Sequence, residues 1–289
     1  MPLVEVILGG VILGGLYALV AIGFNLQYGM ARIVNLAYGE FLMGAAFAAF
    51  FMFTLAGINP ILGMVFSVPA AFAANWAIYR VLMSPLVRRA RTRDQLEGET
   101  ILATFGLLFV LRGAATLAFS ADNRYYDYLG EPLHIFGFTF AANRVLALAV
   151  AGVFGAAIWL ILEFTRFGAS LRALAIDPVG AQLVGIDVGR LSALAFACGG
   201  ALAAAAGTLV STFFSFNPAI GIEFTMKALV VVIMGGIGNM GGSLIAGLLL
   251  GVAEALCSYF VDSGLTLAVA YALFLIVLVA RPRGLFGTP

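Results

Sequence analysis

Long apolar runs alternate with short polar breaks along the whole chain. A hydrocarbon core of roughly 30 Å requires about 20 apolar residues of helix to cross it. Runs of that kind predict membrane-spanning helices near residues 4–24, 38–56, 60–82, 100–119, 143–163, 190–214, 225–258 and 264–280. We therefore expect an all-α, polytopic membrane protein with about eight or nine spanning helices, forming a single transmembrane domain over residues 1–289.

Two breaks in this pattern do not suit a regular helix. The stretch GGIGNMGG at 235–242 falls inside the run 225–258, which is too long for one crossing. The stretch NLQYGMARIVN at 25–35 separates the first two runs. Irregular backbone at membrane depth is tolerated only where protein covers it or water reaches it. We expect broken or re-entrant segments that line a pathway; the alternative is two ordinary short loops.

Arginine gathers after the third apolar run, after the fifth run and near the C-terminus. The residues are Arg80, Arg88, Arg89, Arg91 and Arg93, then Arg166, Arg172 and Arg190, and finally Arg281 and Arg283. The positive-inside rule places these segments in the cytoplasm. The acidic, tyrosine-rich segment 121–140 is expected at the outer face, with Tyr125, Tyr126 and Tyr128 as an interfacial belt. The N-terminus is then outside and the C-terminus inside. Because MPLVEVILGG lacks basic residues, we expect it to begin the first span.

Composition and charge narrow the possible functions. The chain is 63% hydrophobic and 10% charged with a net charge of +1, which excludes the basic surface of a nucleic-acid-binding protein. The single lysine, Lys227, lies in IEFTMKALVV and not in a phosphate-binding loop, so ATP hydrolysis is expected on another chain. His134 stands alone, and no carboxylate pair lies within one span. We predict no catalytic residue, metal site or cofactor.

A patterned polar segment, TRFGASLRALAIDPVGAQLVGIDVGRL, occupies residues 165–191. Asp177 before Pro178 fits a helix N-cap, and Gly185 and Asp187 fit the end of that helix and the cap of the next. A short helix across the inner face could dock into a groove on a cytoplasmic partner; its predicted apolar contacts are Leu171, Leu174, Leu183 and Val184. The alternative is an interfacial helix lying on lipid.

Five segments together resemble the permease subunit of branched-chain amino acid ABC importers. In order they are GLYALVAIGFNLQYGMARIVNLAYGEFLMGA (15–45), RALAIDPVGAQLVGID, FACGGALAAAAGTLVS (196–211), KALVVVIMGGIGNMGGSLIAGLLLGVAEAL (227–256) and RPRGLFG (281–287). The resemblance implies a bacterial inner-membrane complex with a second homologous permease subunit, two cytoplasmic ATP-binding subunits and an extracytoplasmic solute-binding protein. It also implies that the solute is a branched-chain amino acid or a related small molecule such as urea, a short amide or an aromatic acid.

The same resemblance assigns roles to the polar loops. The segment 165–189 would be the coupling segment that contacts the ATPase, and the residues that match the family there are Arg172, Asp177, Ala181 and Gly185. The acidic outer loop would meet the solute-binding protein. The alternative function is a secondary transporter or channel that works without an ATPase; the coupling segment would then lie on lipid.

Polar residues beside the two breaks are the candidates for the translocation pathway, because polar groups within a membrane usually face the bundle interior. They are Asn25, Gln27, Asn35 and Glu40 at the first break and Glu223, Lys227 and Asn239 at the second. A zwitterionic amino acid requires hydrogen-bond donors for its carboxylate and acceptors for its ammonium. Local roles are the alternative: Asn25 and Asn35 cap helices, Glu40 caps a helix or pairs with Arg32, and Lys227 reaches the outer interface. Glu254 is expected at an interface near a span end.

Overall fold

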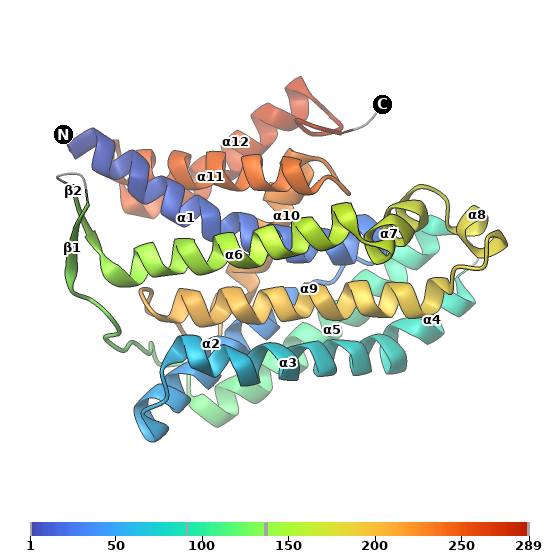
Figure 1. Cartoon of the computed structure of the whole chain (residues 1–289), viewed down its shortest axis with the longest axis horizontal. Coiled ribbons are helices and arrows are strands. Elements are labelled where there is room, and N and C mark those ends of the chain that lie inside the picture. The colour runs from blue at the N-terminus through green and yellow to red at the C-terminus, as the bar shows by residue number, and fades with distance from the viewer. Residues whose placement is uncertain (1, 91, 136–137, 288–289) are drawn as a thin grey trace.

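The computed structural model describes residues 2–90, 92–135 and 138–287, and its long helices run side by side as one bundle (Figure 1). The elements are α1 (Pro2–Asn25), η1 (Leu26–Met30), α2 (Tyr38–Ala56), α3 (Pro60–Ile78), η2 (Tyr79–Met83), α4 (Ser84–Arg89), α5 (Arg93–Phe119), β1 (Pro132–Ile135), β2 (Phe138–Ala141), α6 (Ala142–Phe164), α7 (Arg166–Ile176), α8 (Pro178–Leu183), α9 (Val188–Ser211), α10 (Ile220–Gly235), α11 (Met240–Phe260), η3 (Ser263–Leu265) and α12 (Thr266–Ala280). Here η1 and η2 are π-helical turns and η3 is a 3₁₀ turn.

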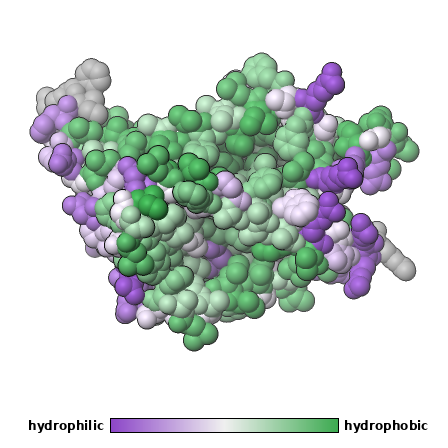
Figure 2. Space-filling model, turned by 60° about the horizontal axis from the view of Figure 1, so that its bottom comes forward, coloured by the Kyte–Doolittle hydropathy of each residue, from purple (hydrophilic) through white to green (hydrophobic). Residues whose placement is uncertain are grey.

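The surface of the bundle is that of a protein embedded in lipid. Eight of the described helical segments are long and apolar enough to cross a membrane. The surface drawn in Figure 2 is apolar over its middle and polar toward both ends. Such a band is what hydrocarbon requires, because helices satisfy their own backbone groups and only apolar side chains face the lipid. The chain is a multi-pass, mostly helical membrane protein, as the apolar pattern predicts.

Glycine and alanine bring the central helices into close contact. α9 is buried along most of its length, and a Cβ on its Gly207 would overlap the backbone of Leu42 in α2. At the contact of α1 with α11, a Cβ on Gly251 would overlap the backbone of Gly14. Small residues at helical spacing allow this approach, which van der Waals contact then stabilises. The small-residue segments 197–207 and 246–255 are therefore packing faces within the chain.

Both predicted breaks are present. The run 225–258 divides at residues 236–239, where Gly236 and Gly238 have φ angles of +105° and +85° that favour glycine. The first break consists of η1 followed by residues 31–37, which contain no helix or strand. The two breaks touch each other, because a Cβ on Gly29 would overlap the backbone of Gly238.

The described residues of the segment 121–140 differ from the expected belt. The segment contains an antiparallel hairpin of β1 and β2, a small exception to the all-α fold. Tyr126 and Tyr128 are buried, whereas Tyr125 is 58% exposed, so the predicted interfacial belt is wrong for two of its three members. The Tyr126 hydroxyl lies 2.8 Å from Ser211 Oγ, and Tyr128 donates to Asn59 Oδ1 at 2.9 Å. These contacts tie the loop onto the bundle.

The capping residues of the 165–191 segment are placed as predicted. Asp177 Oδ1 accepts a hydrogen bond from Val179 N at 3.0 Å and begins α8, and Gly185 has a φ of +83° in the turn that follows. Asp187 Oδ1 accepts from Arg190 N at 3.0 Å and begins α9. The segment forms two helices, α7 and α8, at the end of the bundle away from the β1–β2 hairpin (Figure 1).

Candidate functional site

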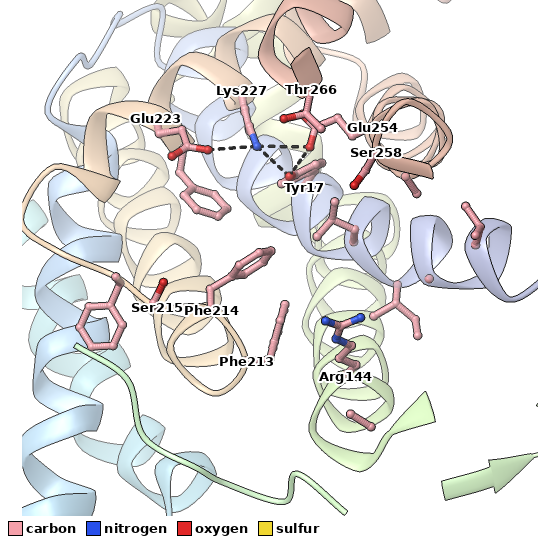
Figure 3. Close-up of a pocket in the computed structure, with 18 of the residues that line it drawn as sticks. Tyr17, Arg144, Phe213, Phe214, Ser215, Glu223, Lys227, Glu254, Ser258 and Thr266 are labelled. Atoms are coloured by element: carbon pink, nitrogen blue, oxygen red, sulfur yellow. Dashed lines mark hydrogen bonds and ion pairs between the residues drawn. The ribbon is translucent and has the colours of Figure 1, made fainter. Parts of the chain in front are cut away.

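A cleft of about 920 Å³ lies between α1, α10 and α11, with β2, the start of α6 and the loop before α10 at its mouth. Its position near the β1–β2 hairpin places it toward the end of the bundle opposite α7 and α8. Its charged and aromatic lining residues include Glu5, Tyr17, Arg144, Phe213, Phe214, Glu223, Phe224, Lys227 and Glu254. Figure 3 shows most of these side chains.

One wall of the cleft carries a network centred on Lys227. The ammonium lies 3.2 Å from a carboxylate oxygen of Glu223, one turn earlier on α10, and 3.3 Å from Glu254 Oε2 on α11. Lys227 also donates to the Tyr17 hydroxyl at 2.8 Å, and that hydroxyl donates to Glu254 Oε2 at 2.6 Å (Figure 3). Pairing of this kind is required at such a depth, because an unpaired charge in a membrane interior is costly.

The two carboxylates beside Lys227 differ in their access to the cleft. The Glu254 side chain is only 4% exposed, and that of Lys227 is 9% exposed, whereas Glu223 is 46% exposed. Tyr17 and Glu254 therefore hold the ammonium from the protein side, and Glu223 faces the open space. The rings of Tyr17 and Phe224 lie 4.7 Å and 5.8 Å from the ammonium and add cation–π attraction.

The rest of the cleft combines charge with aromatic surface. The Arg144 guanidinium lies on the side facing the Lys227 network, and Phe213 and Phe214 project into the space beside both (Figure 3). Clefts that bind small molecules are mostly apolar with a few placed polar groups. This arrangement suits a small solute that carries both charges and an apolar portion.

Most of the other predicted pathway residues brace the two breaks instead. Asn25 donates to Asn239 O at 3.1 Å and to Ser243 Oγ at 2.9 Å, and its Oδ1 accepts from Gly238 N at 2.8 Å. Gln27 donates to Phe196 O at 2.8 Å, and Asn35 donates to Gln27 Oε1 at 2.9 Å. None of Asn25, Gln27 and Asn35 lines the described cleft. They satisfy irregular backbone and one another within the protein.

Asn239 and Glu40 complete the predicted set. Asn239 caps α11 by accepting from Gly242 N at 2.8 Å, and it donates to Phe286 O at 3.0 Å. Glu40 is buried in the first turn of α2 against Gly221, and its carboxylate has no hydrogen-bond partner among the described residues. Neither residue lines the cleft, so Glu223 and Lys227 are the predicted pathway residues that the structure places there.

Residues 6–279 match the sequence profile of a protein family. That family is described as the permease component of branched-chain amino acid transport systems. The chain belongs to this family. It is thus the permease component of an ABC transporter and is not itself catalytic.

Relatives and a solved structure cover nearly the whole permease. It is 32% identical to the high-affinity branched-chain amino acid permease LivH of Escherichia coli K12, over 97% of this chain and 94% of that protein. It is 30% identical to the high-affinity branched-chain amino acid permease BraD of Pseudomonas aeruginosa, over 98% of this chain and 95% of that protein. The ribose import permease RbsC of E. coli K12 is 28% identical, over 86% of this chain and 74% of that protein. A chain of PsaBC from Streptococcus pneumoniae, solved with a Fab, shares the fold with a TM-score of 0.52 and 12% identity. The match covers 96% of this chain and 91% of that chain.

Sequence reasoning missed two residues of the permease's charged network, Tyr17 and Glu254. The expectation that Glu254 lies at an interface is wrong, because its side chain is buried within α11. A signal was present in the spacing. Gly247, Gly251 and Glu254 share one helical face, as do Gly10, Gly14 and Tyr17, so the glycine faces that join α11 to α1 also carry the two polar residues. Arg144, opposite the network, was likewise not singled out.

The residues predicted to contact an ATPase shape the 165–189 segment of the permease. Arg172 bonds to Leu162 O and lies 3.5 Å from Glu163, Asp177 caps α8, Ala181 is buried and Gly185 forms the turn. Of the predicted apolar contacts, Leu171 and Leu174 are buried inside the chain, so they are unavailable to a partner. Exposed apolar side chains of the α7–α8 segment include Ile176, Val179, Leu183 and Val184.

Proposed function

We propose that this permease forms the solute pathway of an ATP-driven importer, and that it carries branched-chain amino acids or a related small solute. The observation that carries the proposal is the cleft with Lys227 clamped between Glu223 and the buried Tyr17–Glu254 pair. The names of LivH and BraD support branched-chain amino acids, and the name of RbsC supports a broader set of solutes.

The cleft supports a particular way of holding a zwitterion. Glu223 and Lys227 form an ion pair at helical i,i+4 spacing in which the Glu223 side chain is 46% exposed, so water reaches this carboxylate and weakens its attraction to the ammonium. A solute carboxylate can replace Glu223 at the ammonium, and the freed Glu223 can accept the ammonium of the solute. Phe213 and Phe214 would then cover an apolar side chain. Every charge remains paired during this exchange, which keeps its cost low.

The placement of the cleft supports import. With the N-terminus outside and the C-terminus in the cytoplasm, the mouth near the β1–β2 hairpin faces the external side, where a solute-binding protein would deliver the solute. The exposed apolar face of Ile176, Val179, Leu183 and Val184 would contact an ATP-binding subunit on the other side. A second, homologous permease subunit would complete the pathway. This assembly belongs in the bacterial inner membrane.

The decisive experiment is a pull-down of the tagged, detergent-solubilised permease from its host, followed by reconstitution into proteoliposomes. Co-purification of two ATP-binding subunits and a second permease is expected, with ATP-dependent uptake of radiolabelled leucine in the presence of the binding protein. Urea, acetamide and benzoate serve as the competing solutes. Uptake by the isolated chain without ATP would instead establish a secondary transporter or channel and overturn the proposal.

A further inference from the structure

The segment 31–37, between η1 and α2, is irregular in backbone but firmly held. Ile33 and Asn35 are fully buried, and Ile33 N donates to Gln27 O at 3.1 Å. Thr104 of α5 satisfies one further group, because its Oγ1 accepts from Leu36 N at 3.1 Å. The Thr104 hydroxyl donates to Thr100 O at 2.8 Å and also lies 3.3 Å from Val34 O. Close packing leaves such a segment little room to deform, so it moves together with the residues that hold its ends.

The cytoplasmic end of this segment is bonded to α7. Arg32 donates to Ala175 O at 2.5 Å and to Ile176 O at 3.2 Å, the last carbonyls of α7. A cation is favoured there by the negative end of the helix dipole. Asp177, which caps α8, is the next residue. Arg32 has a φ of 56°, a left-handed conformation that is costly for a residue with a Cβ and persists only where the surroundings impose it.

The other end of the segment is bonded to the helix that carries Lys227. At the start of α2, Gly39 N donates to Thr225 Oγ1 at 2.8 Å. The two backbones are in contact there, since a Cβ on Gly39 would overlap Gly221 O. Thr225 lies on α10 between Glu223 and Lys227. A displacement of the α2 start therefore acts directly on the helix that forms the charged wall of the cleft.

We propose that residues 31–37 mechanically link the α7–α8 segment to the cleft, with Arg32 and Thr225 as the positioning residues at its two ends. This inference rests on the proposed function. Movement of α8 by an ATP-binding subunit is passed through Arg32 to the start of α2 and then to α10. Rotation of α10 separates Lys227 from Glu254 on α11 and releases a solute held at the ammonium.

Uncoupling of ATP hydrolysis from uptake is the result that distinguishes this link from a purely structural role. The intact complex, co-purified from the host, is reconstituted with Arg32→Ala, Arg32→Lys, Thr225→Ala or Thr225→Ser in the permease. Thr208→Ala is the matched control, because Thr208 is an equally buried helical threonine whose hydroxyl bonds to Ala204 O, away from the segment. Uptake of leucine, urea, acetamide or benzoate, whichever the wild type accumulates, is measured together with ATP hydrolysis.

The expected result is a loss of uptake per ATP hydrolysed of about tenfold in Arg32→Ala and Thr225→Ala, within the usual range of coupling between sites. Arg32→Lys and Thr225→Ser retain a donor or hydroxyl and should keep most of the coupling, and Thr208→Ala should match the wild type. If uptake per ATP hydrolysed is unchanged in both alanine variants, whether or not both rates fall, the link is overturned while the importer stands. Absence of ATP-dependent uptake in the wild-type complex would overturn the proposed function itself.

Discussion

At the scale of single residues, the side chains within the membrane divide into those that satisfy the fold and those that face the cleft. Asn25, Gln27 and Asn35 have their hydrogen bonds completed by nearby backbone and one another. Lys227 shares its ammonium with Glu254 and with the exposed Glu223. The second arrangement leaves a charged group that can change its partner, and for that reason we propose that it contacts the solute.

Removing one member of the buried Lys227–Glu254 pair should destabilise the protein more than removing both. Lys227→Met leaves the buried charge of Glu254 without its partner, at an expected cost of about 3–5 kcal/mol in the free energy of unfolding, whereas Glu254→Gln leaves Lys227 paired with Glu223 alone and should cost less. The double variant should recover most of that stability but not uptake. Denaturation in detergent and uptake by the reconstituted complex measure the two effects. Glu223→Gln serves as the exposed control for stability alone, because Glu223 belongs to the proposed solute site. Stabilities that simply add would contradict coupling between the two residues.

The free energy of unfolding should depend on pH through Tyr126, which lies in the loop outside the spanning helices. Burial raises the pKa of its phenol to about 12, above the usual value of 10.0. The folded state thus holds this proton more tightly, so the contribution to stability is complete below about pH 10 and is lost as the pH rises toward 12. Tyr126→Phe should flatten the fall in stability over that window. Tyr125→Phe, an exposed neighbour, should leave it unchanged in the same thermal denaturation series.

At the scale of elements, the contact of α1 with α11 joins packing to the site. Gly10 and Gly14 bring α1 against Gly251, and one turn further along the same faces lie Tyr17 and Glu254. The hydrogen bond between these two residues has a length of 2.6 Å, which requires the helix backbones to remain this close. The glycines are therefore part of the geometry of the charged network as well as of the helix packing.

A larger residue at Gly251 should disturb the network from a distance. Gly251→Leu would overlap the backbone of Gly14 and separate α1 from α11, at an expected loss of stability of about 1–3 kcal/mol or more. Because Tyr17 would also move away from Glu254, uptake should fall further than the amount of folded protein. Gly44→Leu is the control, since space is open around that glycine. Equal effects at both positions would contradict the packing argument.

At the scale of the whole molecule, the two ends of the bundle have different chemistry. The end near the β1–β2 hairpin holds the cleft with its charged and aromatic lining, whereas the opposite end presents the exposed apolar side chains of α8. The Lys227 network and the exposed face of α8 lie on separate elements, so one could be altered without directly changing the other. This separation suits a protein that receives a solute on one side and is driven by a partner on the other.

Charges placed on the exposed face of α8 should detach an ATP-binding subunit without unfolding the permease. Leu183 and Val184 are 84% and 76% exposed, so Leu183→Asp with Val184→Asp removes an apolar contact and leaves the core untouched. We expect recovery of the ATP-binding subunits in a pull-down to fall by about tenfold, as for the loss of interface anchors. Gln182→Glu is the neighbouring control. Full recovery of those subunits with the double variant would place their contact elsewhere.

The sequence by itself determined that the chain is a multi-pass helical membrane protein and that its helices break near residues 25–35 and 235–242. It also determined that Asp177, Gly185 and Asp187 mark the helix ends of the 165–191 segment. These features depend on local chemistry: the length of an apolar helix, the φ angles open to glycine and the hydrogen bonds of a cap.

Which polar side chain faces the cleft was decided only by the tertiary structure. Tyr17 and Glu254 are 237 residues apart in the chain and meet because glycine-rich faces of α1 and α11 pack together. Asn25 and Asn239 also meet across the chain, but their hydrogen bond joins the two helix breaks and does not line the cleft. Hydropathy records that such residues lie within a span, but the direction each one faces depends on the rotation of its helix against neighbours that are distant in sequence.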